Sequence, residues 1–289
     1  MCIRDRNIPV VFQNFALFPH LTVRENIEYG LRIRGMNTRE RNKKSDSVLG
    51  LLKITDMARK KPHQLSAGQR QRVGLGRALA LEPTPEILLL DEPLGALDAN
   101  LHINMQFELK SIQRELGIIF LQVTHNQSDA LAVADRIVVM NGGQAEQVGA
   151  PSEIFTKPKT RFVAELLGNN NVFEGRVVGR NDGFVIVDTK HGKFHVPIMK
   201  FEPPEGSEVI FVVRLDRLTV NAQNRHNQFE AIFRGKVVSG SLVSYEFLSN
   251  GQSFKVETHL SSGLLSLHSS EKVTLGWNRD EGYLIGQTE

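Results

Sequence analysis

Hydrophobic and polar positions in the first half of the chain follow two different periods. Residues 22–57 carry apolar positions at mostly helical spacing, with the basic stretch Arg39–Lys44 expected to form solvated turns. Ile87–Leu90 is an apolar run of the length of a buried strand, and Ile8–Phe12 and Ile118–Val123 are two further mainly apolar segments of strand length. Because such strands alternate with helices, the pattern predicts an α/β layer with a largely parallel sheet.

Further helices and a hairpin complete this half of the chain. The turn Asn141-Gly142-Gly143 lies between two apolar runs and predicts a β-hairpin. Gly117 is a stop signal for the longest helical pattern. The predicted helices are Arg70–Ala80, Leu101–Leu116 and Ala130–Ala134, and the predicted hairpin strands are Ile137–Met140 and Gln144–Val148.

The pattern changes after about residue 168. Short strand-like runs separated by turns replace the helical spacing, and Val172–Val178 is weakly repeated by Ala231–Val238. Repeated short strands with glycine turns suggest a small barrel, which could consist of two related halves. We therefore expect a first domain over residues 1–165 and an all-β domain over residues 166–289.

Composition and charge argue against several classes of protein. With 289 residues, 40% hydrophobic and 23% charged, the chain has an ordinary globular composition and is long enough for two domains. A net charge of +3, with scattered Lys and Arg, gives no reason to expect a nucleic-acid partner. The single cysteine, Cys2, excludes a disulfide framework. Apolar runs such as Ile87–Leu90 are far shorter than the roughly 18–20 residues of a membrane span.

Polar side chains follow the predicted parallel strands at the points where the strands end. Asp91 and Glu92 follow one strand, His125 follows the next, and Gln13 follows the first. Ligands bind in open α/β sheets outside the carboxyl ends of the strands. There Asp91 can hold a magnesium-bound water, and Glu92 can orient or deprotonate an attacking water. His125 is placed to donate to a terminal phosphate, and Gln13 to touch both the metal and the water.

A second candidate site lies at a predicted helix start. Ser66, Gly68 and the helix that begins near Gln69 offer free backbone N–H groups and a helix dipole, which together favour phosphate. Structural roles remain open for each candidate taken alone. Ser66 is also a plausible N-cap, His125 a structural histidine, and Gln13 a surface side chain; the carboxylates could mark an exposed strand end.

Five motifs in the correct order give the chain a specific resemblance. It resembles an ABC transporter ATPase with a C-terminal TOBE domain, from the branch that imports polyamines, iron, sulfate and sugars. The match is close from Asn7 to about Asn171, and a TOBE-like pattern follows. The motifs are the Q-loop at Gln13, the signature at Leu65–Gln69 with Ala67 in place of a glycine, Walker B at Ile87–Glu92, the D-loop at Leu97-Asp98 and the switch histidine His125.

The resemblance implies a fold, a reaction and partners. The fold would be a P-loop NTPase-like domain with a helical subdomain, followed by an OB-like TOBE domain. MgATP would be hydrolysed between two copies of the chain at the cytoplasmic face of the membrane, with the chain bound peripherally to permease subunits and working indirectly with an external solute-binding protein. The implied catalytic residues are Glu92 and His125, the nucleotide-binding residues Gln13, Ser66, Gly68, Gln69 and Asp98, and the metal-binding residues Asp91 and Gln13, partly through water.

One family motif is missing from the sequence. No G-x-x-x-x-G-K-[ST] run occurs, and Gly192-Lys193 and Gly235-Lys236 lack both the first glycine and the following hydroxyl residue. In the family this phosphate loop precedes the Q-loop. We therefore expect it upstream of Ile8, with Met1–Asp5 outside the family pattern and the ATPase domain incomplete at its N-terminus.

Two other functions remain open at this stage. One is a non-transport ABC ATPase, against which the importer-like run Phe18–Val23 and the TOBE-like tail argue. The other is a non-catalytic module in which the β-rich half senses a ligand, a reading that only the absent phosphate loop favours. The transported solute is not encoded in the motifs, although Gly168–Phe173 leans towards polyamine- or iron-type importers.

The chain as printed is expected not to hydrolyse ATP, because it has no loop or lysine to neutralise the β- and γ-phosphates. The measurement is phosphate release by the purified chain with magnesium and ATP. Magnesium-dependent turnover that disappears in Glu92→Gln would contradict this expectation.

Overall fold

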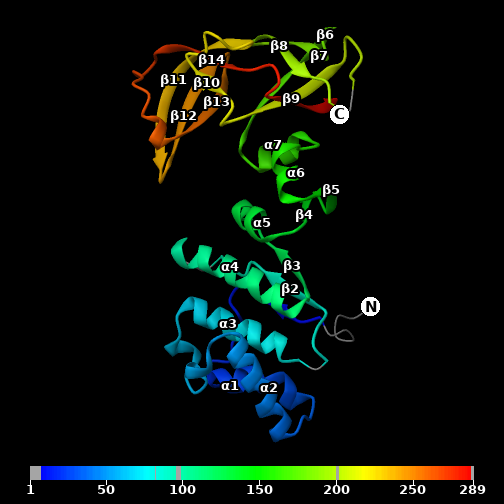
Figure 1. Ribbon diagram of the computed structural model, residues 1–289, viewed down its shortest axis with the longest axis vertical. Helices are drawn as coiled ribbons and strands as arrows, with labels where there is room; N and C mark the ends of the chain where they lie inside the picture. The colour runs from blue at the N-terminus through cyan, green and yellow to red at the C-terminus, as the bar shows by residue number, and fades with distance from the viewer. Residues whose placement is uncertain (1–7, 82, 96–98, 200–201, 288–289) are drawn as a thin grey trace. The chain divides into compact units, whose positions relative to one another are not determined.

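The order of elements in the first part of the chain follows the predicted alternation of helices and strands. The structure, a computed structural model, describes residues 8–81, 83–95, 99–199 and 202–287. Its contacts separate unit 1, Met1–Asp135, from unit 2, Arg136–Glu289 (Figure 1). The two units divide after Asp135, before the domain boundary that we expected at residue 165. That domain boundary stays a prediction. Unit 1 contains β1 Val10–Val11, α1 Val23–Ile33, α2 Thr38–Leu51, the 3-10 turns Thr55–Met57 and Pro62–Gln64, α3 Ala67–Leu79, β2 Ile87–Asp91, α4 Ala99–Leu116, β3 Ile119–Val123 and α5 Gln127–Val133.

The basic stretch expected to form turns lies inside a helix. Arg39–Lys44 belongs to α2, which begins after Asn37, whose side chain accepts from the backbone N–H of Glu40 at 3.0 Å. The helix buries only Ser45, Val48 and Leu49 near its C-terminal end. The expectation of turns was wrong because an N-cap and three buried positions are enough to stabilise a helix whose other face is charged.

Unit 1 is built on a parallel sheet in the order β1-β2-β3. Leu90 pairs with Val11 on one side and with Gln122 on the other, and Asp91 pairs with Val123. Leu88, Leu90 and Val11 are buried in one core with side chains of α3 and α4. The predicted parallel arrangement is confirmed, and it brings the carboxyl ends of all three strands to one edge.

Within the described residues of unit 1, no element covers the opposite face of this sheet. Successive side chains of a strand point to opposite faces, and on β3 Ile119, Leu121 and Val123 are 62%, 55% and 62% exposed. Leu121 lies beside Leu89 of β2 in the register, which places an apolar row on this face. Parallel sheets are normally covered on both faces. Unit 1 therefore presents an uncovered apolar face, defined here by Ile119, Leu121 and Val123.

The turn that follows β1 has an unusual backbone held by one arginine. Phe15 and Ala16 have φ angles of 59° and 42°, which are uncommon for residues with a side chain. Arg77 of α3 donates to the carbonyl of Ala16 at 2.5 Å and to that of Phe15 at 3.0 Å. Burial lowers the pKa of Arg77. Its guanidinium also lies 5.6 Å from the ring centroid of Phe18, so Arg77 fixes the path of the chain around Gln13.

Unit 2 begins with a hairpin and two short helices and continues as antiparallel sheet. The sheet orders are β15-β9-β6-β7-β8 and β10-β14-β11-β12-β13. The elements are β4 Ile137–Asn141, β5 Gln144–Gly149, α6 Pro151–Thr156, α7 Arg161–Leu166, β6 Asn170–Asn181, β7 Phe184–Thr189, β8 Gly192–Pro197, β9 Glu208–Arg214, β10 Thr219–Val220, β11 Asn227–Ser239, β12 Leu242–Ser249, β13 Gln252–His259, the 3-10 turn Leu260–Ser262, β14 Lys272–Trp277 and β15 Gly282–Gln287.

The two sheets of unit 2 are built alike and exchange their last strands. The weakly repeated segments lie in β6 and β11, each the central strand of its sheet, and each shifts register beside a glycine, Gly179 or Gly235. The strand that follows β9 is β10, which pairs in the second sheet, and the strand that follows β14 is β15, which pairs in the first. Phe173 of β6 packs against Phe254 of β13 with ring centroids 5.1 Å apart, within one core shared by both sheets.

The uncovered apolar face should make the chain associate. Leu121→Gln is expected to weaken self-association about tenfold or more, because removing a leucine from an apolar contact costs roughly 1.5–3 kcal/mol. Light scattering across a concentration series measures this. Val237→Gln, an equally exposed apolar position on β11, is the matched control. Equal association of both variants would mean that the face is not the contact.

Loss of Arg77 should release the turn that carries Gln13. In Arg77→Met, the carbonyls of Phe15 and Ala16 lose their charged donor, at a cost of roughly 3–6 kcal/mol for two such hydrogen bonds. Cleavage by chymotrypsin at this turn is expected to accelerate about tenfold or more. Arg59→Met, at an exposed position, serves as the control. An unchanged cleavage rate in Arg77→Met would contradict the assignment.

Candidate functional site

The carboxyl edge of the parallel sheet presents two adjacent carboxylates at the end of β2. Asp91 is the last residue of the strand, and Glu92 follows with a φ angle of 45°. The backbone N–H of Glu92 donates to the carbonyl of Val123 at 2.9 Å, which extends the pairing of β2 and β3 by one residue. A left-handed backbone at a residue with a side chain costs on the order of 1–3 kcal/mol and persists only where the surroundings hold it.

This backbone geometry brings Glu92 to His125. His125 Nδ1 lies 2.6 Å from Glu92 Oε1, and because a carboxylate only accepts, the imidazole is the donor. The His125 side chain is 77% exposed and that of Glu92 is 26% exposed. The second ring nitrogen, Nε2, has no partner among the described residues and remains available for another group.

Gln13 joins the same edge from the end of β1. A methyl group at Gly95 would approach Gln13 Nε2 to 3.2 Å and Glu92 Oε2 to 3.7 Å, so both side chains converge on this glycine. Gln13 and Asp91 also line one hollow of about 410 Å³ with Phe12, Asn14 and Ala16. Gly95 leaves room for the amide of Gln13 to lie beside the carboxylates.

The chemistry of this edge fits a magnesium ion held together with phosphate oxygens. Asp91 is exposed, and among the described residues no hydrogen bond or ion pair occupies its carboxylate. No group of three or more His, Cys, Asp or Glu in the described part of the chain could hold a metal ion alone. Magnesium is commonly bound through one or two carboxylates, with water and substrate phosphates completing its shell. Asp91, with Gln13 beside it, could supply the protein ligands of such an ion.

The signature segment forms a capped helix start away from this edge. Ser66 Oγ accepts from the N–H of Gln69 at 3.3 Å, and Gln69 Oε1 accepts from the N–H of Ser66 at 2.9 Å. The capping role is therefore present, and it leaves the N–H groups of Ala67 and Gly68 without an acceptor among the described residues. No described hydrogen bond joins this segment to Asp91 or Glu92. Asp98 lies outside the described residues.

Sequence reasoning missed two groups that support the site. One is Arg77, because nothing in a helix pattern distinguishes an arginine that binds distant carbonyls. The other is Asp129 in the first turn of α5, which is 2% exposed and contacts Nε2 of His102 and accepts from Gln106 Nε2 at 2.8 Å. Asp129 ties α5, which follows His125, to α4. The available signal was an acidic residue directly before the predicted helix Ala130–Ala134.

Comparisons with known proteins identify the family of the chain. A family model described as ABC transporter matches residues 1–95. The match includes Met1–Asp5, which we expected to lie outside the family pattern. Among the described residues, no helix is long and apolar enough to cross a membrane.

The similar proteins are ATP-binding proteins of ABC systems. The spermidine/putrescine import ATP-binding protein PotA of Frankia alni is 36% identical over 289 residues, which cover 96% of this chain and 58% of that protein. PotA of Thermotoga maritima is 34% identical over 290 residues, covering 97% and 78%. The ABC transporter ATP-binding protein YdcT of Escherichia coli, described as uncharacterized, is 47% identical over 171 residues, covering 59% and 50%. The chain thus spans between about half and three quarters of the length of these relatives, and it belongs to the ABC transporter family, among the ATP-binding subunits of importers.

Proposed function

We propose that this chain is the ATP-hydrolysing subunit of an importer, with its catalytic residues at the carboxyl edge of the β1-β2-β3 sheet. The contact between Glu92 and His125 carries the proposal. It joins the ends of two neighbouring parallel strands, and Gln13 and Asp91 line a hollow at the same edge. Because the chain belongs to the ABC transporter family, MgATP is the ligand that would bind at this edge.

Each residue has a role that its position supports. Magnesium, when bound, neutralises charge on the β- and γ-phosphates. Asp91 and Gln13 would hold it, partly through water. Glu92 would orient and deprotonate the attacking water. Its carboxylate accepts from Nδ1 of His125. The exposed Nε2 of the same ring would donate to the terminal phosphate in the doubly protonated imidazole, because a neutral imidazole has only one donor.

The remaining contacts to ATP would come from a second copy of the chain. Ser66, Gly68 and Gln69 lie at the start of α3, where the free N–H groups and the helix dipole favour phosphate. Since no described contact joins them to the Asp91 edge of their own chain, they are available to a partner. We infer that two copies enclose each nucleotide in this way, with Asp98 at the interface between them.

Transport would follow from coupling this closure to membrane permease subunits at the cytoplasmic face. The relatives named for spermidine and putrescine import favour a polyamine as the solute. We infer that unit 2 includes a regulatory domain of the TOBE type. An external solute-binding protein would act indirectly, by delivering the solute to the permease.

The test uses an extended chain, meaning this chain preceded by a strand–loop–helix segment that carries G-x-x-x-x-G-K-[ST]. Glu92→Gln should leave ATP binding intact, abolish turnover and trap a dimer. His125→Ala should reduce turnover roughly 10²-fold or more, because it removes a donor to developing phosphate charge. Phosphate release and light scattering measure the two effects.

Matched variants separate these roles from general damage. Glu86→Gln changes an exposed carboxylate at the other end of β2, and His63→Ala removes an exposed histidine before α3. Both should keep normal turnover. If Glu92→Gln or His125→Ala behaves like its control, the assignment of that residue is wrong.

A further inference from the structure

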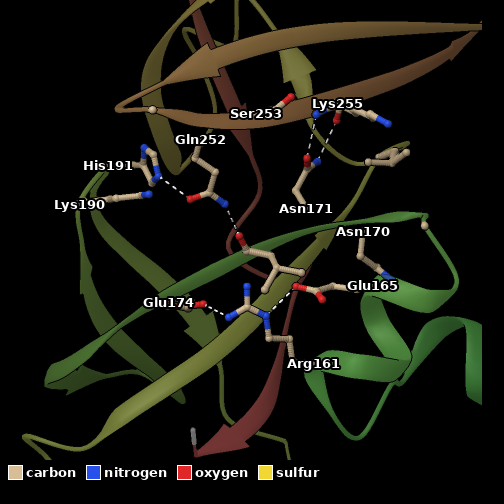
Figure 2. Close-up of a pocket in the computed structure, with 14 residues that line it drawn as sticks. Arg161, Glu165, Asn170, Asn171, Glu174, Lys190, His191, Gln252, Ser253 and Lys255 are labelled. Atoms are coloured by element: carbon tan, nitrogen blue, oxygen red, sulfur yellow. Dashed lines mark hydrogen bonds and ion pairs between the residues drawn. The ribbon is translucent and has the colours of Figure 1, made fainter. Parts of the chain in front are cut away.

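A polar hollow of about 720 Å³ lies in unit 2, along the seam between its two sheets (Figure 2). Its walls come from α7, β6, the turn between β7 and β8, and the start of β13. The side-chain amide of Asn171 on β6 bonds both backbone groups of Lys255 on β13, each at 2.8 Å. Gln252 Nε2 donates to the carbonyl of Val172 at 2.7 Å. Hydrogen bonds between the sheets therefore hold the walls in place.

The charges around this hollow are not balanced. Its two carboxylates share the single positive charge of Arg161, whose Nε lies 2.6 Å from Glu165 Oε1 and whose Nη1 contacts Glu174. Lys190 and Lys255 also line the hollow, and no carboxylate among the described residues pairs with either. With Arg161, Lys190 and Lys255 against Glu165 and Glu174, the lining of the hollow carries one net positive charge.

His191, beside Lys190, faces a hydrogen-bond acceptor with each ring nitrogen. Gln252 must point its amide Nε2 at the carbonyl of Val172, so its Oε1 faces His191 Nε2, at 3.1 Å. Ser249 Oγ donates to the carbonyl of Glu230 at 2.6 Å and can therefore only accept from His191 Nδ1, at 3.2 Å. A neutral imidazole has one donor. Both bonds form together only when His191 is protonated.

The surroundings of His191 oppose that protonation. Burial lowers its pKa, the bond to Gln252 counteracts this, and the charge of Lys190 lowers it further. The ring is packed against Phe254, with centroids 4.9 Å apart, and cannot turn freely to water. Lys255 of β13 also lines the hollow, and the carboxylates of Glu165 and Glu174 share the one charge of Arg161. The two hydrogen bonds together thus need a cation in a hollow whose lining already carries a net positive charge.

We propose that the hollow binds a small polyanion, an ion or metabolite with two or more anionic oxygens, beside Lys190 and His191. The anion supplies the missing negative charge and holds His191 in its doubly protonated form. In that state the turn between β7 and β8 is bonded firmly to β12 and β13, so binding tightens the seam between the sheets. Inorganic oxyanions and polycarboxylates share this chemistry, and the hollow has room for either.

Equilibrium dialysis of the full chain with labelled sulfate is the first test, because the charge of sulfate does not change near neutral pH. The free protein has a His191 pKa below its usual 6.5, so binding at pH 7 must take up a proton. Affinity should then be greatest at low pH and fall as pH rises, by up to about tenfold per unit. Labelled citrate at pH 7.5 tests a larger polycarboxylate in the same way.

Three variants identify the site. Lys190→Gln should weaken binding at least about fivefold, since it removes one near charge. Lys193→Gln, an exposed lysine on β8 outside the hollow, should change it no more than twofold. His191→Gln should bind weakly and without dependence on pH. Its retained fold is checked by circular dichroism, and Lys190→Gln tests the site independently should that variant fail to fold.

Tighter binding of citrate than of sulfate would identify an extended polycarboxylate site. Tighter binding of sulfate would identify a compact oxyanion site. Either result supports the proposal if Lys190→Gln weakens the binding. The proposal is overturned if neither probe binds at millimolar concentration, or if affinity does not depend on pH or on Lys190. Binding of a polyamine that Glu174→Gln abolishes, with no binding of either anion, would also overturn it.

Discussion

The parallel pairing of β2 with β3 is the constraint on which the candidate site depends. Their register sets Asp91 beside Val123, and the N–H of Glu92 continues the ladder to the carbonyl of Val123. The chain then leaves β2 through a left-handed residue, Glu92, whose carboxylate meets His125 at the end of β3. His125 lies there, two residues beyond the same carbonyl. A shift of one residue in this register would move the polar pair apart and turn the buried leucines of β2 outward.

The polar edge and the apolar face of this sheet have the same origin. Alternation along β2 and β3 directs Leu88 and Leu90 into the core shared with α3 and α4, and it directs Leu121 to the uncovered side. Arg77 then fixes the turn after β1 from below, by binding carbonyls that no strand or helix satisfies. The position of Gln13 at the carboxyl edge is thus determined by the packing of α3 against the covered face of the sheet. In unit 2 the two similar sheets are held together in a different way, by the exchange of β10 and β15 between them.

Much of this could be predicted from the sequence, because the relevant signals are local. Mainly apolar segments located β2 and β3, and the polar residues after them located Glu92 and His125. The helix α2 was missed because its charged face hides a short buried stripe that ends at Leu49. Arg77 was missed because its partners lie about sixty residues away along the chain. The run around Asn171 was interpreted only as a sign of the solute class, whereas in the structure its amide joins two sheets, a contact that depends on tertiary structure.

The central claim is that adjacent carboxylates at one strand end divide the chemistry, with Asp91 acting on the metal and Glu92 on the water. The most direct test is the affinity of manganese, as a spectroscopic substitute for magnesium, for the extended chain with saturating ATP, followed by electron paramagnetic resonance. The account predicts that Asp91→Asn weakens manganese binding about tenfold or more while Glu92→Gln leaves it within about twofold, since only the first change removes a metal ligand. Equal weakening in both variants, or loss in Glu92→Gln alone, would contradict the account.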